Sequence, residues 1–254
     1  YSDNATMTQD IALSKLTTFR IGGTPSWYAC PKNYQELEKA LEECASRELP
    51  YRVLGGGSNL LVDDGDLPFA VIHICAPAFS WIRPCSQNDG TLRVGAGTRI
   101  TQLLRESRDL GLGGLEFMAG IPGTVGGAVT GNAGAWGNCV GDMISRLWSW
   151  DETGGRHEIT ADDLNFSYRS ASIPADIVTE VELQLTPRNT DLVGRQIQQN
   201  LDKKRSGQPT SAPNAGCVFR NPEDTSAGRM LDRCGLKGST IGGAAVSQQH
   251  ANFI

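Results

Sequence analysis

The sequence predicts an α+β protein made of two α+β subdomains and a third, C-terminal unit. Residues 1–76 alternate strand, helix, strand, turn and strand, which is typical of a small α/β unit. Residues 77–187 change to strands, one short helix and long glycine-rich loops. Residues 188–254 open with an amphipathic helix after a polar segment. We expect these three ranges to be the domains of the chain.

The first unit contains a helix that should begin after Asn33. An asparagine side chain at that position can accept a hydrogen bond from a first-turn amide, which no backbone group satisfies. The segment "WYACP" precedes this helix in the sequence. After the helix, "YRVLGGGSNLLV" and "FAVIHI" are typical of strands, and the first of these two runs into a glycine turn. The apolar residues at helical spacing are Leu37, Ala40, Leu41, Cys44 and Ala45.

In the second unit, "TLRVGAG" and "IVTEVELQL" have strand patterns, and a helix is expected near residues 101–109. The segment "TPRNTD", residues 186–191, is expected to be a linker. The helix that follows places Leu192, Val193, Ile197 and Leu201 on one face and ends in "KKRSGQP".

Composition excludes several partners and sites. A formal net charge of -5 over 254 residues argues against nucleic acid, and no apolar run approaches the ~18 residues of a membrane span. No leader resembling a signal peptide is present, and seven cysteines cannot all pair, so we expect free thiols in a reducing compartment. The histidines lack metal-binding motifs. We expect a cytoplasmic protein, monomeric and without a metal, that binds a small molecule.

Two glycine segments are the strongest sign of a binding site. "GGGSN" at 55–59 directly follows a strand, and "GIPGTVGG" spans 120–127. Amides in tight glycine turns form concavities for anions, and apolar residues of the second segment offer a surface to a flat ligand. A large cofactor with a pyrophosphate suits both, although ordinary loops also contain glycine. No P-loop is present and "GAGTRI" lacks the third dinucleotide-binding glycine, which disfavours a nucleotide kinase and a Rossmann dehydrogenase.

Seven ordered segments resemble one known family. They are "TTFRIGG", "LGGGSNLLV", "AGIPGTVGGAVTGNAGAWG", "FSYRS", "AGCVFRNP", "AGRMLDRCGLKG" and "GGAAVSQQHANFI". The set is similar, over residues 17–254, to the UDP-N-acetylenolpyruvoylglucosamine reductases, the MurB family. The resemblance implies a vanillyl-alcohol-oxidase-like (PCMH-type) FAD-binding fold, followed by a substrate-binding domain that is truncated in this chain.

The resemblance also implies the reaction and the cofactor-binding residues. In this family NADPH reduces FAD, and the enolpyruvyl group of UDP-N-acetylglucosamine enolpyruvate is reduced to give UDP-N-acetylmuramate for peptidoglycan. Ile177 would pack near the flavin, although strand alternation equally places it in the core. The residues that would hold FAD are Gly55, Gly56, Gly57, Ser58, Asn59, Leu60, Gly120, Ile121, Pro122, Gly123, Thr124, Gly126, Gly127 and Ala128.

Two residues match the family's catalytic positions. Arg169, in "FSYRS", would stabilise a substrate carboxylate that gains negative charge; the sequence alone suggests a surface ion pair. Cys217, in "AGCVFRNP", stands where many members carry a proton-donating serine. A thiol, with an ordinary pKa of about 8.5, can donate a proton readily, but a buried inert cysteine is the alternative.

Further residues would bind the substrate. Tyr168, Asn221 and the cluster Lys203, Lys204 and Arg205 resemble substrate contacts, with the cluster near the uridine diphosphate; the alternative for the cluster is a solvated helix end. Trp136 is expected either in the pocket or in the core.

The sequence departs from the family at its end. Members continue beyond "HANFI" with a glutamate that takes part in catalysis, and no residue up to Ile254 takes that place, Glu180 and Glu182 included. We therefore expect either an incomplete chain or an impaired reductase. A flavin-binding protein without reductase activity and a related FAD oxidase remain as alternatives.

Overall fold

The computed structural model describes residues 7–85, 89–151, 155–173, 177–210 and 212–254. The helices are α1 (Tyr34–Ser46), α2 (Ile100–Asp109), α3 (Val125–Thr130), α4 (Thr190–Gly207) and α5 (Ala227–Arg233). Short 3₁₀ turns are η1 (Leu13–Lys15), η2 (Pro77–Phe79), η3 (Glu116–Met118), η4 (Val140–Met143) and η5 (Ala161–Asp163).

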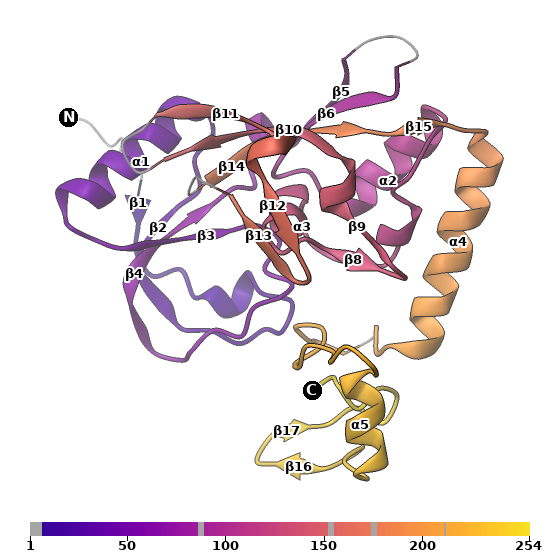
Figure 1. Ribbon diagram of the computed structural model, residues 1–254. Coiled ribbons are helices and arrows are strands. Elements are labelled where there is room, and N and C mark those ends of the chain that lie inside the picture. The colour runs from indigo at the N-terminus through magenta and orange to yellow at the C-terminus, as the bar shows by residue number, and fades with distance from the viewer. Residues whose placement is uncertain (1–6, 86–88, 152–154, 174–176, 211) are drawn as a thin grey trace.

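The strands fall into two main sheets and several short pairs (Figure 1). They are β1 (Met7–Thr8), β2 (Thr24–Ala29), β3 (Tyr51–Leu54), β4 (Asp66–His73), β5 (Ile82–Pro84), β6 (Thr91–Gly95), β7 (Leu112–Gly113), β8 (Gly134–Ala135), β9 (Asn138–Cys139), β10 (Ile144–Trp150), β11 (Arg156–Thr160), β12 (Asn165–Ser167), β13 (Ser170–Ser172), β14 (Ile177–Gln184), β15 (Thr186–Pro187), β16 (Thr240–Ile241) and β17 (Ala244–Ala245).

The first sheet has the order β1-β2-β4-β3 among the described residues. Strands β2 and β3 both run parallel to β4, so the carboxyl ends of all three meet at one edge, where the first glycine loop begins. Helix α1 covers this sheet with the buried side of its predicted apolar stripe. The predicted cap is confirmed, because the Asn33 side chain accepts from the Glu36 amide at 2.9 Å.

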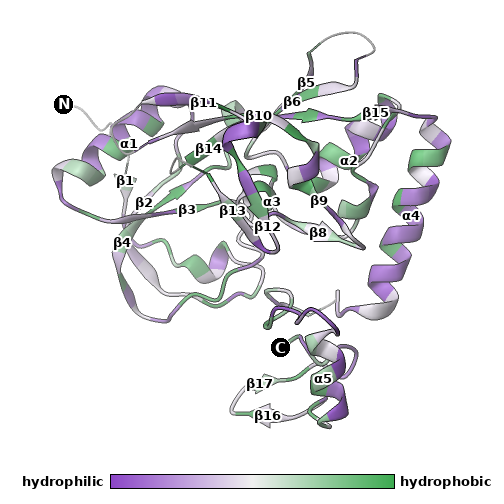
Figure 2. Cartoon of the chain, in the orientation of Figure 1, coloured by the Kyte–Doolittle hydropathy of each residue, from purple (hydrophilic) through white to green (hydrophobic). Residues whose placement is uncertain are grey.

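The second sheet has the order β11-β10-β14-β6-β5 and is antiparallel throughout the described strands. Its inner face contributes the main core with Leu92, Val94, Leu147, Val181 and Leu183, against which α3 packs. In Figure 2, hydrophobic colouring gathers in this central part, whereas much of α4 is hydrophilic. The strand predicted for "IVTEVELQL" is confirmed as β14, although both of its faces are buried over residues 177–181.

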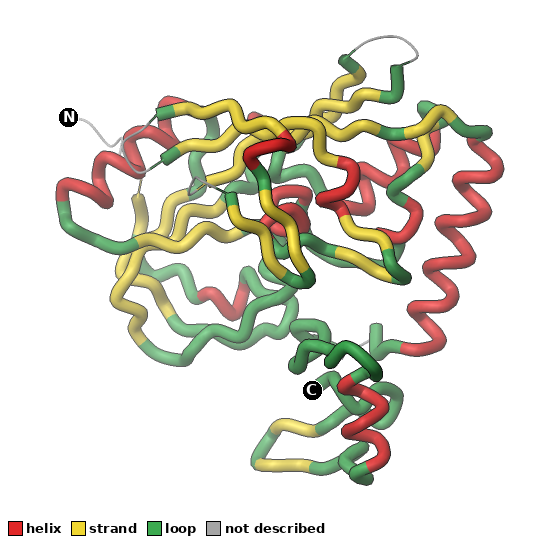
Figure 3. Tube along the Cα trace, viewed as in Figure 1, coloured by secondary structure: helices red, strands yellow, loops and turns green. Residues whose placement is uncertain are grey.

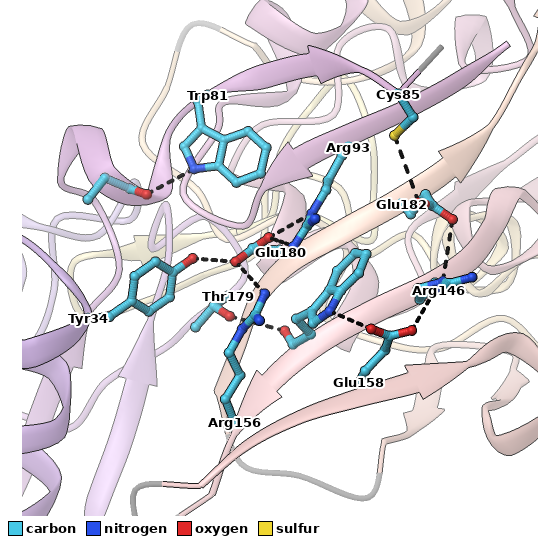
Figure 4. Close-up of polar contacts among 12 residues, drawn as sticks. Tyr34, Trp81, Cys85, Arg93, Arg146, Arg156, Glu158, Thr179, Glu180 and Glu182 are labelled. Carbon is cyan, nitrogen blue, oxygen red and sulfur yellow. Dashed lines mark hydrogen bonds and ion pairs between the residues drawn. The ribbon is translucent and has the colours of Figure 1, made fainter.

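The outer face of this sheet holds the two subdomains together (Figure 4). Glu180 is 5% exposed and accepts hydrogen bonds from Tyr34 on α1 at 2.6 Å and from the Arg93 Nε at 2.8 Å, while Arg156 lies 3.1 Å away. The Arg93 guanidinium lies 3.7 Å from the centre of the Trp148 ring. Burial and the neighbouring Glu180 raise the pKa of Tyr34, so its hydroxyl remains a donor. Glu180 therefore has a structural role.

Helix α4 is fixed to the body near its middle and through Arg188, which lies just before it. The Asn200 side chain donates to the Glu116 carbonyl at 2.8 Å, and the Glu116 carboxylate contacts Arg188 at 3.1 Å. The segment expected as a linker is structured: Thr186–Pro187 form strand β15, paired with β7, and Asn189 caps α4 by accepting from two amides. The pairing partner lies more than 70 residues away in sequence, at residues 112–113, so local patterns give no sign of it. The predicted domain boundaries stay predictions.

Residues 212–254 lie below the body in Figure 1 and consist mostly of loops around α5 (Figure 3). Hydrogen bonds attach them to earlier parts of the chain, among them the following. The Thr18 hydroxyl donates to the Asn214 carbonyl at 2.8 Å, and the Gln249 side chain donates to the Arg205 carbonyl at 2.9 Å. Within the described residues, none of the helices combines the length and apolarity needed to cross a membrane.

Candidate functional site

The two glycine segments meet main chain to main chain. A Cβ at Gly56 would lie 2.6 Å from the Gly123 Cα, and a Cβ at Gly55 would lie 2.5 Å from the Thr124 hydroxyl. Only residues without a side chain allow this approach. The contact joins the carboxyl end of β3 to the loop before α3 and makes one continuous cradle from segments about 65 residues apart in sequence.

The first loop, residues 55–60, is held from behind by "TTFRIGG". Gly57 has a φ of 59°, and a Cβ there would lie 2.1 Å from the Leu16 carbonyl. The Thr18 amide donates to the Gly57 carbonyl at 3.0 Å. From the front, the Ser58 hydroxyl donates to the Pro122 carbonyl at 3.2 Å. These contacts fix the loop before any ligand arrives.

The amides of this loop are available to a ligand. Among the hydrogen bonds made within the described part of the chain, none is donated by the amides of Gly56, Ser58 or Asn59. Successive unpaired amides in such a turn form a concavity for phosphate oxygens. The exposed side chains of Leu60 and Leu61 border it. The cradle therefore fits the pyrophosphate and flat ring of a dinucleotide cofactor.

A second group of residues sits at a hairpin tip. Strands β12 and β13 are joined by Tyr168 and Arg169 alone, and Arg169 has a φ of 58°. A left-handed conformation costs about 1–2 kcal/mol for a residue with a side chain. Such local strain in a residue other than glycine is typical of functional positions.

Asn132, which the sequence analysis did not single out, holds this hairpin. It is 6% exposed; its side chain donates to the Ser167 carbonyl at 3.0 Å and accepts from the Gly141 amide at 3.1 Å. Asn132 belongs to the long glycine segment, at "GNAG". The same segment therefore forms part of the cradle and positions Arg169.

Lys204, Arg169 and Cys217 come from three elements and influence one another electrostatically. Burial, together with the positive charge of Arg169, lowers the pKa of Lys204 to about 8. Burial raises the pKa of Cys217, and the two cations oppose that shift. Cys217 therefore stays a thiol near neutral pH, beside two positive charges that would stabilise its thiolate.

Lys204 also connects this group to the cradle. A Cβ at Gly120 would lie 3.0 Å from the Lys204 Cδ, so the aliphatic part of the lysine crosses the glycine segment. Its ammonium nitrogen lies 5.7 Å from the centre of the Trp136 ring, within the range of a cation–π contact. Trp136 is 50% exposed, so of its two expected positions the core is wrong, and its place in the pocket stays a prediction.

These observations allow comparison with known proteins. Residues 25–160 match the family described as "FAD binding domain", and residues 208–254 match "UDP-N-acetylenolpyruvoylglucosamine reductase, C-terminal domain". The reductase of Moorella thermoacetica is 41% identical over 95% of this chain and 79% of its own length. That of Synechococcus sp. (strain JA-3-3Ab) is 40% identical over 96% and 78%.

The chain belongs to the UDP-N-acetylenolpyruvoylglucosamine reductase family. The crystal structure of the reductase from Thermus caldophilus superposes with a TM-score of 0.84 at 37% identity, covering 97% of this chain and 87% of that one. The Bermuda grass isoallergen BG60 shares the fold alone, with a TM-score of 0.56 at 16% identity over 73% of this chain and 42% of that one. The expected FAD-binding fold is confirmed.

The structure brings most of the predicted reductase residues near one another, with two qualifications. Ile177 is fully buried in β14 opposite Trp150, where it is part of the core, and its contact with a flavin stays a prediction. Lys203 and Arg205 are exposed at the end of α4. The Asn221 amide donates to the Tyr168 hydroxyl at 3.3 Å, so these two predicted residues touch. Among the described residues, no cluster of His, Cys, Asp and Glu could hold a metal ion.

Proposed function

We propose that this chain is an FAD-dependent UDP-N-acetylenolpyruvoylglucosamine reductase that uses NADPH to convert UDP-N-acetylglucosamine enolpyruvate into UDP-N-acetylmuramate, a peptidoglycan precursor. The observation that carries the proposal is the glycine cradle beside the group Arg169, Lys204 and Cys217. When bound, FAD supplies reversible hydride transfer. The cradle amides of residues 56, 58 and 59 would hold its pyrophosphate.

The protein's own part of the chemistry concerns charge and a proton. Reduction of the enolpyruvyl double bond adds a hydride to one carbon and a proton to the carbon beside the carboxylate. Arg169 would pair with that carboxylate as negative charge builds up on it. Cys217 would give the proton, because burial keeps its thiol protonated and the nearby cations stabilise the thiolate that remains.

The substrate nucleotide would lie along the end of α4. Lys204 and Arg205 would contact the diphosphate, and the touching pair of Tyr168 and Asn221 would close the site from the hairpin side. Lys204 keeps its aliphatic part against Gly120, so a diphosphate bound to its ammonium lies next to the cradle. In this arrangement the substrate would extend from its diphosphate, at the end of α4, toward the cofactor.

The deciding experiment measures substrate-dependent NADPH oxidation by the purified, FAD-loaded protein. We expect Cys217→Ala to lower turnover by at least ~100-fold, the usual contribution of a general acid, while Cys217→Ser keeps part of it. Bleaching of the visible flavin absorption by NADPH alone should be unchanged in both variants. Cys234→Ala, at an exposed cysteine beyond α5, is the matched control. Equal turnover of Cys217→Ala and the parent protein would remove Cys217 from this role.

The same assay distinguishes the alternatives. A protein that NADPH bleaches but that leaves the enolpyruvyl substrate unchanged would be a flavin-binding member without reductase activity. Bleaching by an alcohol donor, followed by rapid recovery in air, would identify an oxidase.

We also propose that the enzyme acts as a cytoplasmic monomer. All seven cysteines are free, which supports a reducing compartment. Light scattering of the eluting protein on a sizing column should give the mass of one chain, and a doubled mass would contradict a monomer.

A further inference from the structure

Two cysteines that the proposed reaction does not use lie sulfur to sulfur. Cys30 directly follows β2 and Cys75 follows β4 by two residues; these strands are parallel neighbours, with Ala29 opposite Ile72. The two Sγ atoms are 2.9 Å apart, and both cysteines are free. Cys75 is exposed and Cys30 is half-buried, so a small reagent can reach the pair.

We propose that Cys30 and Cys75 are a redox-modification site, which forms a reversible intramolecular disulfide by exchange with a small-molecule disulfide of the glutathione type. This inference goes beyond the proposed reductase function and does not depend on it.

The geometry supports bond formation. A disulfide has a sulfur–sulfur distance of about 2.05 Å, so the two Sγ atoms need to approach by less than about 1 Å. Both residues lie past the ends of their strands, where no strand pairing holds them. The Cys75 amide donates to the His73 carbonyl at 3.1 Å, which marks a tight bend that brings the Cys75 side chain back toward β2.

The surroundings identify Cys30 as the attacking thiolate. A hydrogen bond from the Cys75 thiol, with a smaller effect of the nearby Tyr28 hydroxyl, lowers the pKa of Cys30 to about 7, although burial opposes the shift. The same sharing of one proton raises the pKa of Cys75. Tyr28 is itself held in place, because its hydroxyl lies 2.7 Å from Nδ1 of His73.

The exchange proceeds in two balanced steps. The Cys30 thiolate attacks one sulfur of the small disulfide, which forms a mixed disulfide and releases one small thiolate. Cys75 then loses its proton to solvent and attacks the Cys30 sulfur, which forms the Cys30–Cys75 bond and releases the second small thiolate. The two protein thiols are oxidised by two electrons in total, and the small disulfide is reduced to two thiols.

Hydrogen bonds of neighbouring residues connect the site to the cofactor cradle. His73 hydrogen-bonds to the main chain of Gly55, and the Ile74 amide donates to the Leu54 carbonyl at 2.9 Å. The residues between the two sulfurs and the first glycine loop are therefore connected by hydrogen bonds. A disulfide would link the ends of β2 and β4 at the edge from which that loop starts.

The test uses the FAD-loaded full chain incubated with glutathione disulfide at neutral pH, quenched with acid and alkylated. We expect the intact mass to show two fewer alkylated cysteines than in protein kept in reduced glutathione. Digestion should yield one peptide pair linked through Cys30 and Cys75, which dithiothreitol separates. Failure to find this linked pair at any ratio of oxidised to reduced glutathione would overturn the proposal.

Single variants test the order of the steps. Cys75→Ser should stop after the first step and carry one glutathione on Cys30, whereas Cys30→Ser should lose the linked pair and react more slowly. Cys234→Ser, the control, should form the linked pair as the parent does. Glutathione on Cys75 of the Cys30→Ser variant at the parent rate would contradict the assignment of Cys30 as attacking thiolate. If a variant unfolds, the rate of Cys30 alkylation in the parent protein, measured against pH, still tests whether Cys30 is the attacking thiolate. We expect this rate to reach half of its maximum near pH 7, and a midpoint near pH 9 would contradict the assignment.

Discussion

The side chain of Asn252 makes two hydrogen bonds with the main chain of Phe219. Its side-chain Nδ2 donates to the Phe219 carbonyl at 2.9 Å, and its side-chain Oδ1 accepts from the main-chain amide of Phe219 at 2.9 Å. The Val218 amide donates to the Asn252 carbonyl at 3.0 Å. Asn252 is 1% exposed, so "HANFI" at the end of the sequence holds the segment that carries Cys217.

Asn252→Ala should therefore weaken the site from a distance. Removal of the side chain deletes both hydrogen bonds to Phe219, and a typical hydrogen bond contributes about 0.5–1.5 kcal/mol to stability. We expect a loss of this size in the free energy of unfolding, measured by urea denaturation, together with faster alkylation of Cys217. Asn252→Asp keeps the acceptor, so its free energy of unfolding should lie between those of Asn252→Ala and the parent protein. Unchanged stability in Asn252→Ala would show that the pairing contributes nothing.

Gly56→Ala should weaken FAD binding. The new Cβ would lie 2.6 Å from the Gly123 Cα. The clash is with main-chain atoms, which cannot move aside as the end of a flexible side chain can. We expect the two loops to separate and the dissociation constant for FAD, measured by quenching of flavin fluorescence, to rise by at least roughly tenfold. Gly207→Ala is the matched control, because a Cβ there meets nothing within 4 Å. Equal affinity in the two variants would argue against the cradle.

Binding of uridine diphosphate should weaken as pH rises through 8. Lys204 has a pKa of about 8, below the ordinary value of about 10.4, and only its protonated form attracts a diphosphate. Lys204 is fully protonated only about one pH unit or more below its pKa, and affinity should fall by roughly fivefold between pH 8 and 9 as its protonated fraction decreases. Calorimetric titration with uridine diphosphate measures this. Lys204→Arg should remove the fall, whereas Lys203→Arg, an exposed neighbour, should retain it.

The lowered pKa of Lys204 also makes the stability of the protein depend on pH. Between pH 8 and about 10.4 the unfolded chain binds more protons at Lys204 than the folded chain. The contribution of this residue to the free energy of unfolding therefore rises with pH across that window. Lys204→Met should flatten the rise, and a steeper rise in that variant would contradict the assignment.

Arg169→Gly should separate stability from activity. Glycine adopts a φ of 58° without the steric cost that arginine carries, so the free energy of unfolding should rise by up to about 1 kcal/mol. Turnover should fall by at least ~100-fold, because the cation beside the substrate carboxylate is gone. Thermal unfolding and NADPH oxidation measure the two effects. Ser170→Gly, next in the chain but in a strand, should lower stability instead.

Local patterns predicted the elements well. The cap at Asn33, strands β4 and β14 and helix α2 each depend on neighbouring residues, and all were found; the stripe of α1 was found except for Ala45, which is exposed. Contacts across long sequence separations left no such pattern. Tyr34 and Glu180 are 146 residues apart, and a glutamate within an alternating strand gives no sign of its partner.

The site shows the same division. The glycine segments and the motif residues could be named from the sequence, but the contact between Gly56 and Gly123 follows only from the fold. Asn132 and Asn252 were missed because asparagine in a loop usually indicates a turn. Both asparagines lie within the segments that resemble the family, at "GNAG" and "HANF", and this location could have identified them as candidates.

The hydrogen bond between Thr18 and the Asn214 carbonyl spans 196 positions of the chain. During translation the amino-terminal part leaves the ribosome first and can begin to fold while later residues are still being made. The cofactor cradle can therefore form on a nascent chain well before Cys217 and its surroundings exist. Newly made protein should acquire FAD before the segment that carries Cys217 has folded.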